Sequence, residues 1–264
     1  MSTELPFDKN LRRIRRDRAA LRFHDADYLH RLAADELVER LSLVRWSLSD
    51  ALLLGFPDLL RGRLEEMGLV VTAADPGRRF AAGGVQCDED RLPFADASFD
   101  LVVSVGTLDS VNDLPGALRL VRRALRPDGL FLAAFAGAGS LPQLRKAMLD
   151  ADATRGTASP RIHPQIDVRA AGDLLTRAGF VLSAADTETT IVRFSMLPRL
   201  LSDLRGMAAT NMMVQRARAP IGRKGFAAAA HFFAVAAEGD GRTAERFDLI
   251  YMTGWAPSAP EPIR

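Results

Sequence analysis

Short continuous apolar runs alternate with segments of helical spacing between residues 50 and 195. The run 99–105 contains only two polar residues, which is typical of a strand buried on both faces of a parallel sheet. The segment 114–125 then repeats apolar residues at helical intervals, and Asn112 or Asp113 can cap its start. This pattern predicts a strand followed by an amphipathic helix.

The predicted helix ends at a turn, Arg126-Pro127-Asp128-Gly129, because proline cannot continue a helix and glycine is free to turn. Leu130–Phe135 is the next predicted strand. Strand, helix and strand at this spacing form a crossover unit. Such units place their ligands at the carboxyl ends of the strands.

The same alternation predicts the remaining elements. Further strands are expected at 51–54, 69–73, 180–185, 188–194 and 247–255. Further helices are expected within 7–45 (the second starting at Asp25 or Asp27) and at 59–67, 141–153, 167–177, 197–206 and 225–237, while 207–225 has no clear pattern. We therefore expect an α/β fold with a mostly parallel sheet, helices on both faces and an antiparallel edge.

The composition excludes several classes of protein and site but does not indicate a function. With 264 residues, of which 48% are hydrophobic, the chain can bury a substantial core. The single cysteine, Cys87, excludes an intramolecular disulfide framework and a cysteine-rich zinc site. His24, His30 and His231 lack partners at metal-ligand spacing, so no metal site is predicted. We find no transmembrane run or secretory signal, and we expect a cytoplasmic protein.

Charge is concentrated near the amino terminus, although the net charge is only +2. Residues 9–22 contain seven basic side chains and one acid, Asp17. Our preferred interpretation is a solvated helix face; the alternative is contact with an acidic partner or, peripherally, with an anionic membrane surface. Few aromatic residues lie nearby to stack on bases, so we do not expect nucleic-acid binding.

Three motifs resemble class I methyltransferases that use S-adenosylmethionine, with a likeness that covers roughly residues 30–195. They are Leu92-Pro93-Phe94, Ser98-Phe99-Asp100-Leu101-Val102 and Leu125-Arg126-Pro127-Asp128-Gly129. The resemblance implies a Rossmann-like methyltransferase fold. On it we divide the chain into a helical N-terminal extension (1–45), a methyltransferase-like domain (46–195) and a C-terminal helical segment with a last strand (196–264) that completes the same domain.

Other segments resemble the respiratory complex I assembly factor 5 family and its bacterial relatives over nearly the whole chain. They are Phe7-Asp8-Lys9-Asn10-Leu11, Ile162-His163-Pro164, Leu204-Arg205-Gly206-Met207 and Tyr251-Met252-Thr253-Gly254-Trp255. This resemblance implies a protein substrate or assembly partner. The family's mitochondrial member is associated with arginine hydroxylation of a complex I subunit, so the fold does not fix the reaction. The malonyl-carrier-protein methyltransferases are similar more generally.

The resemblance also implies a cofactor site built from four residues. Gly55 corresponds to the first glycine of the turn after the first strand, where the backbone approaches the cofactor. Asp75 corresponds to the carboxylate that binds the ribose hydroxyls, and Asp88 to the acid that faces the adenine amine. Ser104 lies at the carboxyl end of the third strand, which faces the cofactor in this fold.

The glycine turn departs from the family pattern. Leu53 stands at the position of the family's acid, and Pro57 and Leu59 stand at the second and third glycines. Proline removes an amide donor, and leucine adds bulk where the backbone should be bare. Two functions therefore stay open: an enzyme that uses S-adenosylmethionine, or a pseudoenzyme whose cofactor binding is lost and which binds or assembles proteins.

No catalytic residue is predicted, because methyl transfer depends mainly on positioning of an already reactive cofactor. Asp109-Ser110 replaces a His-Trp pair seen in many relatives. His163 could act as a general base, but we favour a histidine that holds its loop by a hydrogen bond.

Overall fold

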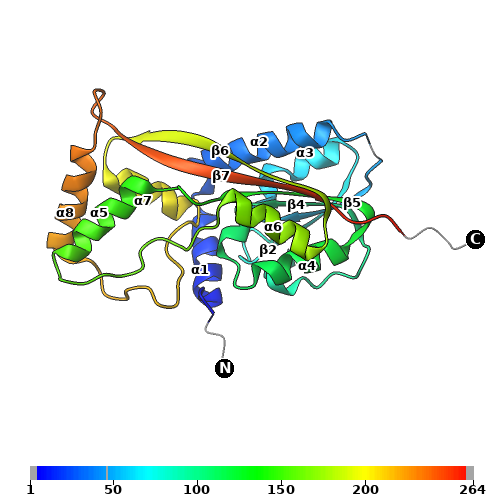
Figure 1. Ribbon diagram of the computed structural model, residues 1–264, viewed down its shortest axis with the longest axis horizontal. Helices are drawn as coiled ribbons and strands as arrows, with labels where there is room; N and C mark the ends of the chain where they lie inside the picture. Colours follow the sequence, from blue (N-terminus) through cyan, green and yellow to red (C-terminus); the bar gives the residue numbers. More distant parts are fainter. Residues whose placement is uncertain (1–4, 46, 260–264) are drawn as a thin grey trace, which may run out of the picture.

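Seven strands form one mixed sheet in the order β3-β2-β1-β4-β5-β7-β6 (Figure 1). The computed structural model describes residues 5–45 and 47–259. Strands β1 to β5 are parallel, and β7 is antiparallel to both β5 and β6. The strands are β1 Asp50–Leu54, β2 Val70–Asp75, β3 Val85–Gln86, β4 Phe99–Val105, β5 Leu125–Ala136, β6 Val181–Phe194 and β7 Thr243–Trp255.

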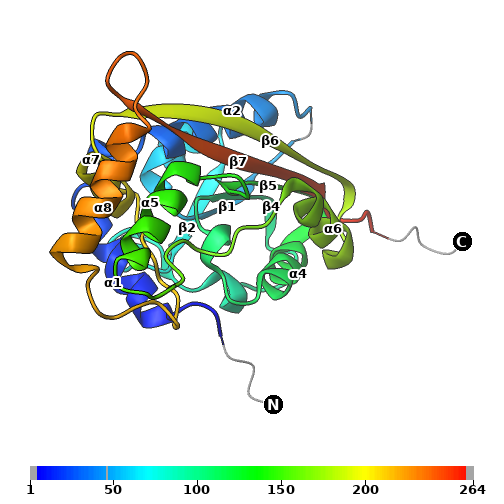
Figure 2. The same cartoon turned by 60° about the vertical axis from the view of Figure 1, so that its left-hand side comes forward.

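Helices cover both faces of this sheet. They are α1 Lys9–Ala19, α2 Tyr28–Ser42, α3 Arg61–Glu66, α4 Leu114–Ala124, α5 Pro142–Ala153, α6 Val168–Ala178, α7 Leu197–Gly206 and α8 Gly222–Val235. Helices α4 and α6 pack on one apolar face of the sheet, and α2 and α3 pack on the other. Helices α5, α7 and α8 gather beyond the carboxyl end of β5, against the extended part of the β6–β7 hairpin (Figure 2).

The structure confirms the predicted α/β class, with a mostly parallel sheet and an antiparallel edge. Strand β4 and helix α7 have the predicted limits. Asp113 is the residue that caps α4, since its side chain accepts a hydrogen bond from Gly116 N at 2.8 Å. Asn112 instead accepts from Phe7 N at 2.8 Å and donates to Phe7 O at 3.0 Å, which ties the amino-terminal segment to the segment between β4 and α4.

Several predicted boundaries were wrong. Strand β7 starts at Thr243 instead of 247, and helix α8 spans Gly222–Val235 instead of 225–237. The segments 180–185 and 188–194 form one strand, β6, because the intervening residues continue to pair with β7. Leu125 starts β5 instead of ending α4, because it pairs with Phe99 of β4. The predicted turn 126–129 is a bulged start of that strand, where Asp128 has a φ of +61°. Arg126 within it pairs with acids at the starts of β1 and β4.

Candidate functional site

Four basic side chains of α1 face the edge of the sheet that the resemblance assigns to the cofactor. Their positions follow i, i+3, i+4 and i+7, a spacing that places them on one face of a helix. Each meets an acid from the end of β2 or from the segment that follows β3. The pairs are Lys9 Nζ with Asp90 Oδ1 at 2.6 Å, Arg12 Nη1 with Glu89 Oε2 at 2.6 Å, Arg13 Nη2 with Asp88 Oδ2 at 2.8 Å, and Arg16 Nε with Asp75 Oδ1 at 2.8 Å.

Asp75, at the carboxyl end of β2, is saturated with donors. Its Oδ1 accepts from Arg16 Nε and, at 2.6 Å, from Gly77 N. Its Oδ2 accepts from Arg16 Nη2 and, at 3.3 Å, from Phe56 N. A carboxylate offers about four acceptor sites. Because Arg16 and Asp75 are exposed by only 3% and 1%, this carboxylate has no oxygen left for ribose hydroxyls.

The turn after β1 is filled by side chains rather than left bare. Gly55 and Phe56 both have left-handed backbones, with φ of +82° and +46°. The Phe56 ring stacks on Phe23 with centroids 4.3 Å apart and meets the edge of Phe80 at 4.8 Å. The Arg16 guanidinium lies 4.2 Å from the Phe56 centroid, within range of a cation–π contact. These groups pack together at the turn where the resemblance implies bare backbone.

Asp88 differs from Asp75 because one of its oxygens is free. The side chain is buried and Oδ2 accepts from Arg13, but Oδ1 has no hydrogen-bond partner among the residues the structure describes. Ser104 is fully buried, and its hydroxyl shares a 3.1 Å hydrogen bond with Thr107. The structure thus brings Gly55 and Asp75 together beneath Arg16, whereas Asp88 pairs with Arg13 one turn earlier on α1.

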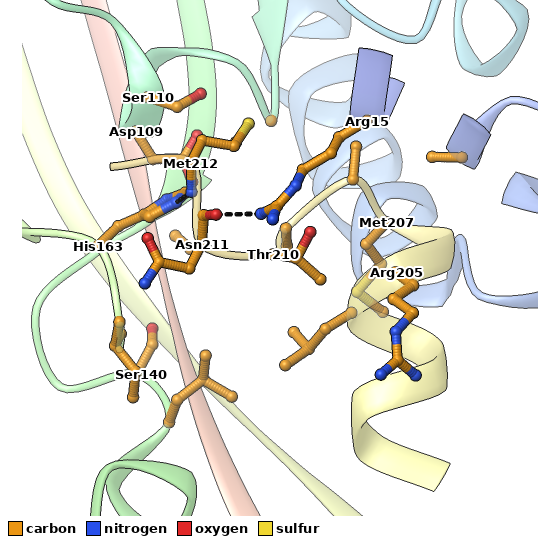
Figure 3. A pocket seen from close by; sticks show the side chains of 18 of the residues that line it. Arg15, Asp109, Ser110, Ser140, His163, Arg205, Met207, Thr210, Asn211 and Met212 are labelled. Carbon is orange, nitrogen blue, oxygen red and sulfur yellow. Dashed lines mark hydrogen bonds between the residues drawn. The ribbon is translucent and has the colours of Figure 1, made fainter. Parts of the chain in front are cut away.

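Beside this closed edge lies a cavity of about 1240 Å³. The carboxyl ends of β4 and β5 form its inner end, and α1, α5, α7 and the segments 161–165 and 207–218 form its walls (Figure 3). Asp109 lines it just after β4. Burial raises the pKa of the Asp109 carboxyl to about 6, although the charges of Arg12 and Arg16 oppose that rise.

His163 has the loop-holding role that we favoured. Its Nε2 accepts a hydrogen bond from Met212 N at 2.8 Å, and its ring meets the edge of Phe7 at 5.1 Å (Figure 3). Burial and the positive charge of Arg15 lower the pKa of His163 to about 4. The ring is therefore neutral near pH 7, and its Nε2 is occupied as the acceptor of the hydrogen bond from Met212 N.

We predicted that the basic face of the amino-terminal helix is solvated. This prediction was wrong for Arg12 and Arg16. Arg12 and Arg16 are buried, and the acidic surface that α1 meets belongs to the same chain. Neither arginine was predicted as a site residue. The available signal was the spacing of the four basic positions together with the acidic run 88–90.

Comparison with known proteins agrees with this fold. The family described as Methyltransferase domain matches residues 61–133, a range that begins just after the filled turn. The chain is 36% identical over 174 residues to Arginine-hydroxylase NDUFAF5, mitochondrial, of Danio rerio, covering 66% of this chain and 54% of that protein. It is 34% identical over 176 residues to the malonyl-[acyl-carrier protein] O-methyltransferase of Xylella fastidiosa, covering 67% and 58%.

A solved structure of a candidate methyltransferase from Bacillus halodurans superposes with a TM-score of 0.55 at 14% identity, covering 85% of this chain and all of that one. The matched region spans about half the length of the arginine hydroxylases.

None of the helices in the described part of the chain combines the length and apolar character needed to cross a bilayer. Within 5–45 and 47–259, no three His, Cys, Asp or Glu side chains are grouped so that they could hold a metal ion.

Proposed function

The chain has the class I methyltransferase fold, and from that premise we propose that it is a pseudo-methyltransferase that serves as a protein-binding or assembly factor. The observation that carries the proposal is Asp75, whose two oxygens are occupied by Arg16 and two backbone amides. The carboxylate that would hold the ribose is committed to the protein itself.

Energetics support this proposal. Removing one partner from a buried ion pair costs about 3–5 kcal/mol. A ligand that displaces Arg16 from Asp75 must offset that cost, and each 1.4 kcal/mol or so is a factor of about ten in affinity. S-adenosylmethionine should therefore bind at least about two orders of magnitude more weakly than it would to an open site of the same chemistry.

The altered turn supports the same conclusion independently of Arg16. Pro57 has no amide hydrogen to donate, and Phe56 covers the backbone with its ring. Removal of α1 alone would leave this turn without the glycines that let a cofactor approach. Two separate changes thus act on the same half of the site.

One observation favours the second candidate, an enzyme that uses S-adenosylmethionine on a protein substrate. Asp88 Oδ1 is a buried acceptor without a partner in the described structure, and such a group costs about 1–3 kcal/mol when it stays unsatisfied. A ligand amine could satisfy it. In this case α1 would have to move away from Asp75 before the cofactor enters.

A protein partner is supported by the likeness to the arginine hydroxylases and by the resemblance to complex I assembly factors. A cytoplasmic location remains part of the proposal. Contact of the amino-terminal helix with an anionic membrane has less support, because four of its basic residues pair with acids of this chain.

Isothermal titration of the full chain with S-adenosylmethionine separates the two candidates. The proposal predicts neither heat nor a thermal shift at millimolar cofactor for the wild type. Micromolar binding would overturn it and favour the enzyme. An Arg16→Ala variant, compared with the exposed Arg193→Ala as control, shows whether α1 alone closes the site: a gain of binding in the first variant only would point to a displaceable helix.

A further inference from the structure

Unpaired arginines surround the cavity beside the closed edge. Of the arginines that line it, three form ion pairs, Arg16 with Asp75, Arg161 with Asp152 and Arg216 with Asp8. Five others line the cavity without an ion-pair partner among residues 5–45 and 47–259. They are Arg15, Arg18, Arg22, Arg205 and Arg218.

These five side chains come from three segments that converge on one opening. Arg15 and Arg18 lie on α1, Arg22 follows it, Arg205 lies in the last turn of α7, and Arg218 belongs to the segment after α7. The backbone of Gly206 lies close to Ala26 and to the carbonyl of Arg22, which brings the end of α7 against the segment after α1. Positive side chains from several segments therefore line the cavity; Arg15 is half-buried, and the other four are exposed.

Arg15 lies close enough to Arg18 and to the paired Arg216 to be repelled by both. It is half-buried and donates a hydrogen bond to the backbone carbonyl of Asn211 (Figure 3). Burial, followed by the positive charges of Arg216 and Arg18, lowers the pKa of Arg15, and Asp8 opposes this only in part. An anion placed among these groups would relieve the repulsion, whereas a cation would add to it.

The inner wall of the cavity is apolar. Its side chains come from α2, α5, α7 and β7, and include Leu29, Leu144, Met148, Leu204 and Phe247. The volume exceeds the roughly 300–1,000 Å³ that is usual for small-molecule sites. Asp109 and Asp8 are the only carboxylates among the described lining residues, and Asp8 already pairs with Arg216.

We propose that this cavity binds an amphipathic anion, with a carboxylate or phosphate head among the unpaired arginines and an aliphatic body over the apolar wall. The head is the chemistry that guanidinium groups recognise best, through paired N–H donors. The proposed site adjoins the nucleoside edge and shares Arg16 with it, but the proposal uses neither Asp75 nor the filled turn after β1. A guanidinium or ammonium substrate is disfavoured by the same charges.

Calorimetric titration of the full chain tests the proposal with four matched probes below their micelle-forming concentrations: decanoate, decyl phosphate, decylammonium and decanol. We expect micromolar binding of at least one of the two anions, and at least tenfold weaker binding of decanol and decylammonium. The tighter anion identifies the head group. Equal binding of all four probes, or no anion binding at millimolar concentration, would overturn the proposal.

Variants locate the site. Arg15→Gln combined with Arg205→Gln should weaken anion binding at least tenfold, whereas Arg119→Gln with Arg169→Gln, an equal charge loss on α4 and α6, should leave it unchanged. Ala136→Leu, which narrows the cavity at the end of β5, should weaken binding without a change of charge. The Ala136→Leu variant tests the location of the site even if the double arginine variant fails to fold. Wild-type affinity in a folded Ala136→Leu variant and in a folded arginine variant would contradict the location.

Discussion

The guanidinium of Arg16 and the carboxylate of Asp75 form a buried, two-point ion pair between α1 and the carboxyl end of β2. Replacing Arg16 with alanine leaves the Asp75 charge buried without its counter-ion. We expect Arg16→Ala to lower the free energy of unfolding by about 3–5 kcal/mol, measured by urea denaturation at pH 7.

Arg193 provides the control, because it pairs with Glu238 and Asp240 on an exposed surface. Arg193→Ala should leave stability nearly unchanged, since exposed ion pairs contribute little. Equal, small losses in both variants would mean that the Arg16–Asp75 pair does not hold α1 in place.

Gly55 is expected to tolerate no side chain. It has a φ of +82°, and an added Cβ would lie 2.2 Å from Thr107 Cγ2 and 2.5 Å from Val105 O. Gly55→Ala should destabilise the fold by about 2–4 kcal/mol through left-handed strain and overpacking. Gly62 in α3 has nothing within 4 Å of an added Cβ, so Gly62→Ala should stabilise it by about 0.5–1 kcal/mol. A similar effect at both positions would contradict the tight approach at Gly55.

Asp109 should make stability fall as the pH rises through the acid range. Its pKa in the folded chain is about 6, above the ordinary value of 3.8. Between those values the folded form keeps a proton that the unfolded form has lost, so the contribution declines from about pH 4 to 6 and is constant above. Asp109→Asn should therefore gain about 1–3 kcal/mol relative to wild type between pH 4 and 7. If the unfolding free energies of wild type and Asp109→Asn, measured with urea, changed in parallel with pH, this prediction would be refuted.

His163, in contrast to Asp109, should make the stability of the fold rise with pH in the acid range. Its pKa of about 4 lies below the ordinary 6.5, so the folded form resists a proton that the unfolded form accepts. Its contribution is complete above about pH 6.5 and is lost as the pH falls toward 4. NMR titration should show a ring that stays neutral until about pH 4, and His163→Asn should flatten the acid side of the stability curve. A ring that titrates near pH 6.5 would show that His163 is not buried against Met212.

Local patterns were sufficient for much of the fold. Strand β4 could be predicted because its apolar run is continuous and buried on both faces, and α4 because Asp113 offers a cap before an apolar stripe. The start of β5 could not be predicted locally. There Leu125 pairs with Phe99 of β4, and Arg126 lies 2.8 Å from both Asp50 and Asp100. These partners are distant in the sequence, so the local pattern, which is typical of a reverse turn, does not reveal a bulged strand.

The candidate site was only partly predictable for a similar reason. The altered positions Pro57 and Leu59 are visible in the sequence, and they indicate a changed turn. The occupant of that turn is not visible, because Arg16 lies 59 positions from Asp75. A basic stripe alone does not show whether its partners are solvent, another molecule or the same chain.

The pairing of α1 also sets an order of assembly. The acids that neutralise its four paired basic residues lie 59 to 81 positions further along the chain, so synthesis delivers the helix before any of them. An isolated helix of 11 residues is marginal in water. During translation this segment therefore stays an unfolded, strongly cationic stretch until residue 90 has been made, and its docking onto β2 can only follow the synthesis of those acids.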